Sequence, residues 1–186
     1  MTKEELYLSL DYIDATRRKR LEMARLILTN PNWVDVLLEI AFDVANPVSS
    51  KACWILEYVV KENPEYILPF LDIFTRNLHK VILDSSVRPM AKICEILIKG
   101  YFSQANDKLR TSLTNEHLER IATCCFDWLI GDHKVASKAY SMTALLLLGR
   151  KFNWIHPELK MVLERNYAKG SAAYKARARI TLDKLK

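Results

Sequence analysis

The sequence predicts an all-α fold in which about five helix pairs stack into an α-α superhelix, formed as a single domain over residues 1–186. Three observations predict it. Half of the residues are apolar and only four are glycine, so the chain can build a core and has few residues that interrupt a helix. Apolar residues recur three and four positions apart, which is the spacing of one helix face. Four segments also share a small residue at a common position.

The N-terminal pair is expected over residues 3–12 and 15–28, with a sequence unlike that of the later pairs. A divergent terminal pair is expected because one of its faces meets water. Its second helix contains four consecutive cations, Arg17 to Arg20. Consecutive residues fan around a helix, and Asp14 and Glu22 each lie four residues from Arg18, at the spacing of intrahelical ion pairs. The tract therefore indicates a solvated helix rather than a nucleic-acid patch.

The first helix of each later pair begins at a polar residue, and in three pairs a proline follows. Proline suits this position because its nitrogen would have no hydrogen-bond partner in any case. Pro69 lies further inside its helix and should kink it or shift its start. These first helices are expected over residues 33–42, 66–78, 118–129 and 159–167.

The second helix of each later pair carries a marker alanine. The markers are Ala52, Ala91, Ala139 and Ala176, which are 39, 48 and 37 residues apart. A small residue should recur where a neighbouring helix approaches closely. The longest spacing contains the longest polar connection, residues 103–112. Pro89 is expected in the first turn of its helix, where it costs little.

The pairing of helices and the Val-x-x-x-Ala-like second helix resemble HEAT and armadillo repeats over roughly residues 30–186. The resemblance implies a non-catalytic scaffold whose second helices line a concave, partner-binding face. Cations cluster near the marker positions of these helices. With one tryptophan they form a candidate binding surface, called the basic ridge below: Lys51, Trp54, Arg88, Lys92, Lys138, Lys175, Arg177 and Arg179.

The basic ridge suits either an acidic peptide or a phosphate backbone. An alternative interpretation has equal weight, in which the cations join neighbouring repeats or pair with Glu57 and Glu95. The charge is polarised along the chain, since residues 134–186 contain 12 Lys/Arg against three acids. This asymmetry favours an anionic partner at the C-terminal half.

The residue types that carry chemistry are scattered. The four cysteines form no C-x-x-C pair and lie in apolar helical segments, which indicates small buried hydrophobes rather than disulfides or zinc ligands. The four histidines have no His or Cys partner at a metal-ligand spacing and are expected in solvated or capping roles. Glycine is too scarce for a phosphate-cradling loop. We therefore expect no metal, no cofactor and no enzymatic activity.

Residues 2–7, 52–57 and 86–95 are similar to a family of short uncharacterised bacterial proteins, some of which are labelled adenylosuccinate lyase. The label implies a lyase whose superfamily carries a Gly-rich loop of the form Ser-Ser-x-Met-Pro-x-Lys-x-Asn. Residues 84–94 contain Ser85 and Ser86, but Pro89 and Met90 are in reverse order and Cys94 replaces the asparagine.

A second resemblance in architecture is to the HEAT-like DNA alkylation-repair glycosylases, whose basic concave face holds duplex DNA. Only Asp127-Trp128 resembles their acid-and-aromatic cleft. The leading hypothesis is thus a non-catalytic scaffold for a protein or acidic peptide. A nucleic-acid-binding protein is the alternative, and a lyase is a weaker one.

The longest apolar run, residues 144–148, is far shorter than the roughly 20 residues that cross a bilayer. Residues 1–5 contain no apolar signal core, so we expect a cytoplasmic protein that does not enter membranes. The sequence leaves the oligomeric state open.

Overall fold

The computed structural model describes residues 2–14 and 16–186. The described residues form eleven α-helices and three 3-10 helices and contain no strand, which confirms the all-α class. Ala15, the expected first residue of the second helix, lies outside the described residues.

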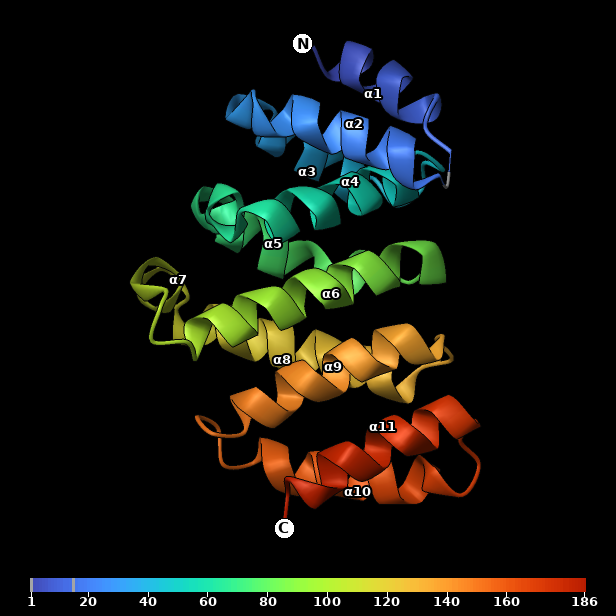
Figure 1. Cartoon of the computed structure of the whole chain (residues 1–186), viewed down its shortest axis with the longest axis vertical. Coiled ribbons are helices and arrows are strands. Elements are labelled where there is room, and N and C mark those ends of the chain that lie inside the picture. The colour runs from blue at the N-terminus through green and yellow to red at the C-terminus, as the bar shows by residue number, and fades with distance from the viewer. Residues whose placement is uncertain (1, 15) are drawn as a thin grey trace.

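Five helices lie side by side in chain order and form one row, with each helix packed against the next (Figure 1). They are α2 (Arg17–Leu28), α4 (Ser49–Glu62), α6 (Asp84–Tyr101), α9 (Val135–Leu148) and α11 (Ala172–Asp183). These are the expected second helices of the five pairs, and the ridge residues all belong to this row.

Three of the expected first helices pack against this row as predicted: α3 on α4, α8 on α6 and α9, and α10 on α9 and α11. The other two differ from the expected pairing, because α1 packs on α3 and α4 rather than on α2, and α5 packs on α8 rather than on α6. The helices of this set are α1 (Lys3–Asp11), α3 (Val34–Phe42), α5 (Leu71–Asn77), α8 (Asn115–Ile130) and α10 (Ile155–Tyr167). Three 3-10 helices accompany them: η1 (Pro31–Trp33), η2 (Pro64–Phe70) and η3 (Leu78–Lys80). Their amphipathic pattern follows from burying one stripe against the row.

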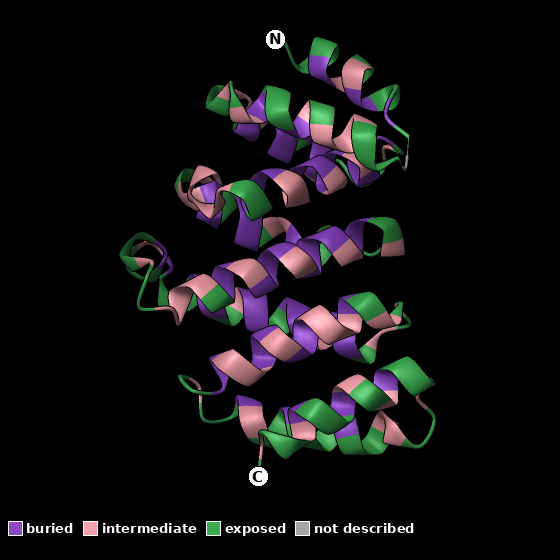
Figure 2. Ribbon diagram, in the orientation of Figure 1, coloured by how far each residue is buried: buried purple, intermediate pink, exposed green. Residues whose placement is uncertain are grey.

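One continuous cluster of buried apolar residues runs through the stack, from Leu6 in α1 to Ala178 in α11. Figure 2 shows that α6 is largely buried, whereas α11 at the C-terminal end is largely exposed. The inner helices are covered by neighbours on both sides, and the end helices on only one. Within the described part of the chain, no helix combines the length and the apolarity needed to cross a membrane.

Pro69 acts as predicted. Residues Pro64–Phe70 form η2, and the regular helix α5 begins only at Leu71, directly after the proline. The Asn63 side chain caps the start of η2 by accepting a hydrogen bond from the backbone N–H of Glu65 at 2.9 Å. The segment therefore begins where the sequence indicated, but as a 3-10 helix.

The prediction for Pro89 was wrong. Helix α6 begins at Asp84, so Pro89 lies in the second turn, where its missing N–H leaves the carbonyl of Ser85 without its usual donor. The indole N–H of Trp54 on α4 donates to this carbonyl oxygen at 2.8 Å. A side chain of the neighbouring helix thus replaces the hydrogen bond that the proline removes.

Two of the four marker alanines do not hold the predicted position. Ala52 and Ala91 are fully buried within the row, but Ala139 is half-buried and Ala176 is exposed. The residues two positions further along, Ser141 and Ala178, are fully buried instead. A shift of two residues turns the side chain to the other side of a helix. Small residues are frequent in α9 and α11, so the sequence does not single out the buried ones.

The polar connection over residues 103–112 contains a short helix that the sequence pattern did not predict, α7 (Asp107–Ser112). The side chain of Asn106 caps it by accepting a hydrogen bond from the N–H of Leu109 at 3.1 Å. Leu109 is 1% exposed and anchors the helix against α6, next to Gly100. A single buried leucine therefore orders a segment that is otherwise polar.

Candidate partner-binding surface

Three cations of the basic ridge, all in its N-terminal half, are ion-paired. Lys51 on α4 lies 3.0 Å from the carboxylate of Asp11, which ends α1. Arg88 on α6 makes two hydrogen bonds to Glu57 on α4, at 2.7 and 3.3 Å. Both pairs join neighbouring helices, and bidentate arginine-carboxylate pairs hold a fixed geometry. These cations are therefore engaged within the fold.

Lys92 is the third cation in this half. Its ammonium lies 2.7 Å from Glu95, and Lys99 contacts the other oxygen of the same carboxylate at 2.8 Å. Burial alone would raise the pKa of Glu95, but the hydrogen bonds from Lys92 and Lys99 hold that pKa below its usual value of 4.5. Lys92 also lies 4.6 Å from the ring centre of Tyr140 on α9. The carboxylate interrupts the positive charge in the middle of the ridge.

Trp54 is a connection between helices rather than an open aromatic surface. Its indole binds Ser85, and the guanidinium of Arg20 on α2 lies 5.7 Å from the ring centres of both Trp54 and Tyr58. The cation-π contact links α2 to α4. Arg20 belongs to the tract predicted to be solvated, and a regular spacing of charges gives no signal for this contact between helices.

The other cations of the Arg17–Arg20 tract lie near the surface. Lys19 pairs with Asp14 at 3.0 Å, and Arg18 lies 3.9 Å from Glu22. The hydrogen bond from Thr16 and the contact with Lys19 hold the pKa of Asp14 far below its usual range. Asp14 thus pairs with Lys19 and not with Arg18 as the spacing predicted. The solvated-helix interpretation otherwise stands for Arg17 and Arg18, which are exposed.

The C-terminal half of the ridge differs in its pairing. Within the described residues, no carboxylate lies within 4.0 Å of Lys138, Lys175, Arg177 or Arg179. Arg177 donates to the hydroxyl of Thr143 on α9, so it joins α11 to α9. Lys138 and Lys175 are half-buried and Arg179 is exposed. Asp183 lies near Arg179 but pairs with Lys186 at 2.8 Å, so none of these four cations has a direct ion pair in the described part of the chain.

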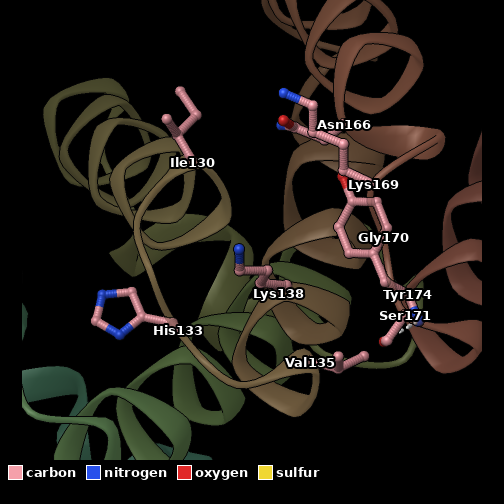
Figure 3. Close-up of a pocket in the computed structure, with 9 residues that line it drawn as sticks. All are labelled: Ile130, His133, Val135, Lys138, Asn166, Lys169, Gly170, Ser171 and Tyr174. Carbon is pink, nitrogen blue, oxygen red and sulfur yellow. Dashed lines mark hydrogen bonds between the residues drawn. The ribbon is translucent and has the colours of Figure 1, made fainter.

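A cavity of about 320 Å³ lies beside Lys138, between the beginnings of α9 and α11 (Figure 3). Lys169 and Tyr174 line it together with Lys138. The Lys138 ammonium lies 6.0 Å from the ring centre of Tyr174. Neither Lys169 nor Tyr174 was among the predicted binding residues, although the position of Lys169 directly before the Gly170-Ser171 helix start is a signal that the sequence contains.

The histidines do serve structural roles where they are buried. His117 lies 3.3 Å from Asp72 and completes a capping box with Thr114 at the start of α8. His133 lies 3.0 Å from Asp84, which also accepts a hydrogen bond from the backbone N–H of Lys134. Burial opposes ionisation of Asp84, but these hydrogen bonds and charges keep its pKa below the usual value.

The four cysteines are buried and free, as the sequence predicted: Cys53, Cys94, Cys124 and Cys125. Burial raises the pKa of the Cys53 and Cys124 thiols to about 12, so neither is a ready nucleophile. In the described part of the chain, no three His, Cys, Asp or Glu residues converge in a way that could hold a metal ion.

The segments that suggested enzymes have structural positions in this fold. Residues 84–94 lie in α6 and not in a loop, and the hydroxyls of Ser85 and Ser86 each lie 2.8 Å from that of Ser50 on α4. Trp128 is buried and donates its indole N–H to the carbonyl of Val81 at 3.2 Å, while Asp127 is exposed. The acid and the aromatic ring of this pair do not face one cleft.

No protein-family model, curated protein or solved structure matches the chain. Its function is therefore argued from the geometry above. The feature that stands out is the contrast between a paired N-terminal half and an unpaired C-terminal half of the same basic ridge.

Proposed function

We propose that the chain is a non-catalytic, HEAT/armadillo-like superhelical scaffold that binds an acidic protein or peptide on the row of second helices. The observation that carries the proposal is the set of unpaired cations on α9 and α11. An acidic partner gains most binding free energy where cations are free, because a cation that is already paired must first separate from its carboxylate. The binding surface is accordingly centred on Lys138, Lys175 and Arg179.

The arrangement of carboxylates favours a protein partner over duplex DNA. Backbone recognition of a duplex needs a continuous track of cations. Glu57 and Glu95 lie within the ridge and neutralise Arg88 and Lys92. A ridge with alternating charge suits a partner that has both acidic and basic residues. DNA binding remains the second candidate because the C-terminal cations by themselves would also attract phosphates.

The proposal is tested by fluorescence anisotropy with a labelled oligo-glutamate peptide and, in parallel, a random duplex of about 20 base pairs. The variant Lys138→Gln/Lys175→Gln/Arg179→Gln should bind the peptide roughly tenfold more weakly, since each exposed charge contact is worth a few tenths of a kcal/mol to 1 kcal/mol. Wild-type protein should bind the peptide more tightly than the duplex at equal salt.

The matched control neutralises three exposed cations on the other set of helices, Arg76→Gln/Lys80→Gln/Arg165→Gln, and so changes the net charge equally. Its peptide affinity should stay close to wild type. Equal losses in both triple variants would mean that only net charge matters, and the proposed surface would be wrong. Tighter binding of the duplex than of the peptide would favour the nucleic-acid alternative.

A further inference from the structure

The cavity between the beginnings of α9 and α11 is lined by cations and by no carboxylate. Lys138 contributes its side chain from the first turn of α9, and Lys169 lies just before α11. Figure 3 shows Lys138 between His133 on one side and Tyr174 on the other. His133 is held by Asp84, 3.0 Å away on α6. No acidic residue of the described part of the chain therefore lines the cavity to balance the positive charge of its lysines.

Both adjoining helices begin at this cavity. Val135, the first residue of α9, and Ser171, the cap of α11, both line it. The Ser171 hydroxyl accepts the N–H of Tyr174 at 3.3 Å, which leaves the first N–H groups of α11 without an acceptor in the helix. Helix starts carry a partial positive charge and free N–H donors, so two of them at one cavity add to the field of the lysines.

Tyr174 provides an independent observation. The residue is 4% exposed, lines the cavity, and its buried hydroxyl has no hydrogen-bond partner within the described residues. Figure 3 shows its ring along the cavity wall, between Ser171 and Asn166. A buried hydroxyl without a partner is costly, because it loses its hydrogen bonds to water and gains none. The side chain of Asn166, which also lines the cavity, is a polar neighbour of this hydroxyl. Because protein atoms cover the hydroxyl, it marks an unsatisfied group beside the cavity and not a donor that a ligand contacts directly.

Buried polar side-chain atoms without a hydrogen-bond partner are concentrated where α9 meets α11. Among the described residues, the buried side-chain atoms without a hydrogen-bond partner all belong to α9 and α11: those of Ser137, Ser141, Tyr174 and Arg177. The other helices of the row satisfy their buried polar groups, as Ser50 and Ser86 do between α4 and α6. The junction of α9 and α11 is thus the place where the fold leaves buried polar groups unsatisfied.

We propose that this cavity is an oxyanion site that binds a phosphoryl group, presented on a phosphorylated side chain of the acidic partner; the inference rests on the proposed function. Two lysines without a carboxylate partner, together with two helix starts, suit a dianion better than a single carboxylate. The side-chain amide of Asn166, which also lines the cavity, supplies a further donor. The apolar side chains of Ile130 and Val135 complete the wall.

The test uses three labelled acidic peptides that differ at one central residue, which is phosphoserine, glutamate or serine. The phosphoserine peptide should bind the full-length protein roughly tenfold more tightly than the serine peptide, with glutamate between them. Inorganic phosphate in the millimolar range should remove this advantage and leave the binding of the serine peptide nearly unchanged. Equal affinity for all three peptides would overturn the phosphoryl site while leaving the acidic-partner proposal intact.

The variants separate the cavity from the rest of the surface. Lys138→Gln and Lys169→Gln should each abolish most of the preference for phosphoserine. Lys175→Gln is the matched control, since it removes one cation of α11 that does not line the cavity, and it should weaken all three peptides by the same factor.

Two further outcomes are decisive. If none of the peptides binds, the proposed function fails, and the cavity inference fails with it unless inorganic phosphate alone raises the melting temperature of wild type but not of Lys138→Gln. If a random duplex competes with the phosphoserine peptide more strongly than free phosphate does, and Lys138→Gln abolishes that competition, then the phosphoryl group comes from a nucleic-acid backbone and the assignment to a phosphorylated side chain is wrong.

Discussion

Whether a cation of the ridge is free to bind a partner depends on its immediate neighbours. Lys92 on α6 and Lys138 on α9 each lie against an aromatic ring of the next helix in the row, Tyr140 and Tyr174. Lys92 also has the carboxylate of Glu95 at 2.7 Å, whereas Lys138 has no acid within 4.0 Å among the described residues. One glutamate therefore decides whether a lysine stabilises the fold or remains free for a partner.

The Lys92–Glu95–Lys99 triad makes a prediction about pH. The pKa of Glu95 is lowered in the folded state, so its charged form stabilises the fold above its unfolded value of about 4.5. This contribution disappears as the pH falls through the lower, folded pKa. Glu95→Gln should therefore be less stable than wild type at pH 7, by roughly 1–2 kcal/mol, and the difference should shrink below about pH 4.

Urea denaturation between about pH 3 and pH 8 measures this difference. Glu119→Gln on α8 is the control, because Glu119 is exposed and has no ion-pair partner within the described residues. It should follow wild type at every pH. A deficit of Glu95→Gln that stays constant down to acidic pH would show that the loss comes from packing and not from the charge of Glu95.

At the scale of the elements, the contact between α4 and α6 depends on a proline. Pro89 removes one backbone donor, and Trp54 supplies another to the same carbonyl oxygen of Ser85 at 2.8 Å. The two residues belong to different helices and are 35 positions apart in the sequence. Their coupling therefore exists only when the helices are packed.

Trp54→Phe should destabilise the protein by about 1 kcal/mol through loss of this hydrogen bond, in addition to the smaller loss of packing. Pro89→Ala restores a backbone donor for Ser85, so Trp54→Phe should cost less in that background. A double-mutant cycle by thermal denaturation measures the coupling. Trp33→Phe is the control, since the indole N–H of Trp33 makes no hydrogen bond within the described residues. If the Trp54 and Pro89 substitutions changed the stability additively, the indole N–H of Trp54 would not replace the backbone donor that Pro89 removes.

The position of each small residue within the row makes a further prediction. Ala91 is fully buried on α6 between α4 and α9, whereas Ala176 is exposed on α11. Ala91→Leu should overpack the row and destabilise it by about 1–3 kcal/mol. Ala176→Leu should change the stability by less than about 0.5 kcal/mol. Equal destabilisation by both substitutions, measured by thermal denaturation, would indicate that Ala91 and Ala176 occupy equivalent positions, as the sequence predicted.

At the scale of the whole molecule, stability should vary along the stack. The inner helices α6 and α9 have a packed helix on each side within the row, and the end helices α1 and α11 are covered on one side only. In such a linear arrangement each element is stabilised mainly by its neighbours. Opening of the ends therefore requires the loss of fewer contacts than opening of the middle.

Native-state hydrogen exchange should show the slowest amides in α6 and α9 and the fastest in α1 and α11. Mass spectrometry of exchanged peptides can resolve the individual helices. Uniform protection along the chain would indicate a globally cooperative unit, contrary to the nearest-neighbour picture. A sharp step between two pairs would instead mark a boundary inside the expected single domain.

Much of the fold follows from local sequence because helical periodicity is a local property. Of the six helices whose bounds were predicted, four begin and end within about three residues of the prediction: those expected over residues 3–12, 15–28, 33–42 and 118–129. The pairing of Lys92 with Glu95 was open to the same reasoning, since the residues lie three apart on one helix. The pairing of Arg88 with Glu57 was only an alternative, because those residues lie on different helices.

By itself, the sequence determined the all-helical class, the order of the helices and the rise of positive charge toward the C-terminus, since each depends on composition or on spacing within one helix. Only the tertiary structure decided which cations are free, which small residues are buried and where donors lack partners. These properties depend on the rotation of each helix about its axis. That rotation is set by the joint packing of several helices. A difference of two residues in which small residue is buried corresponds to about half a turn of the helix.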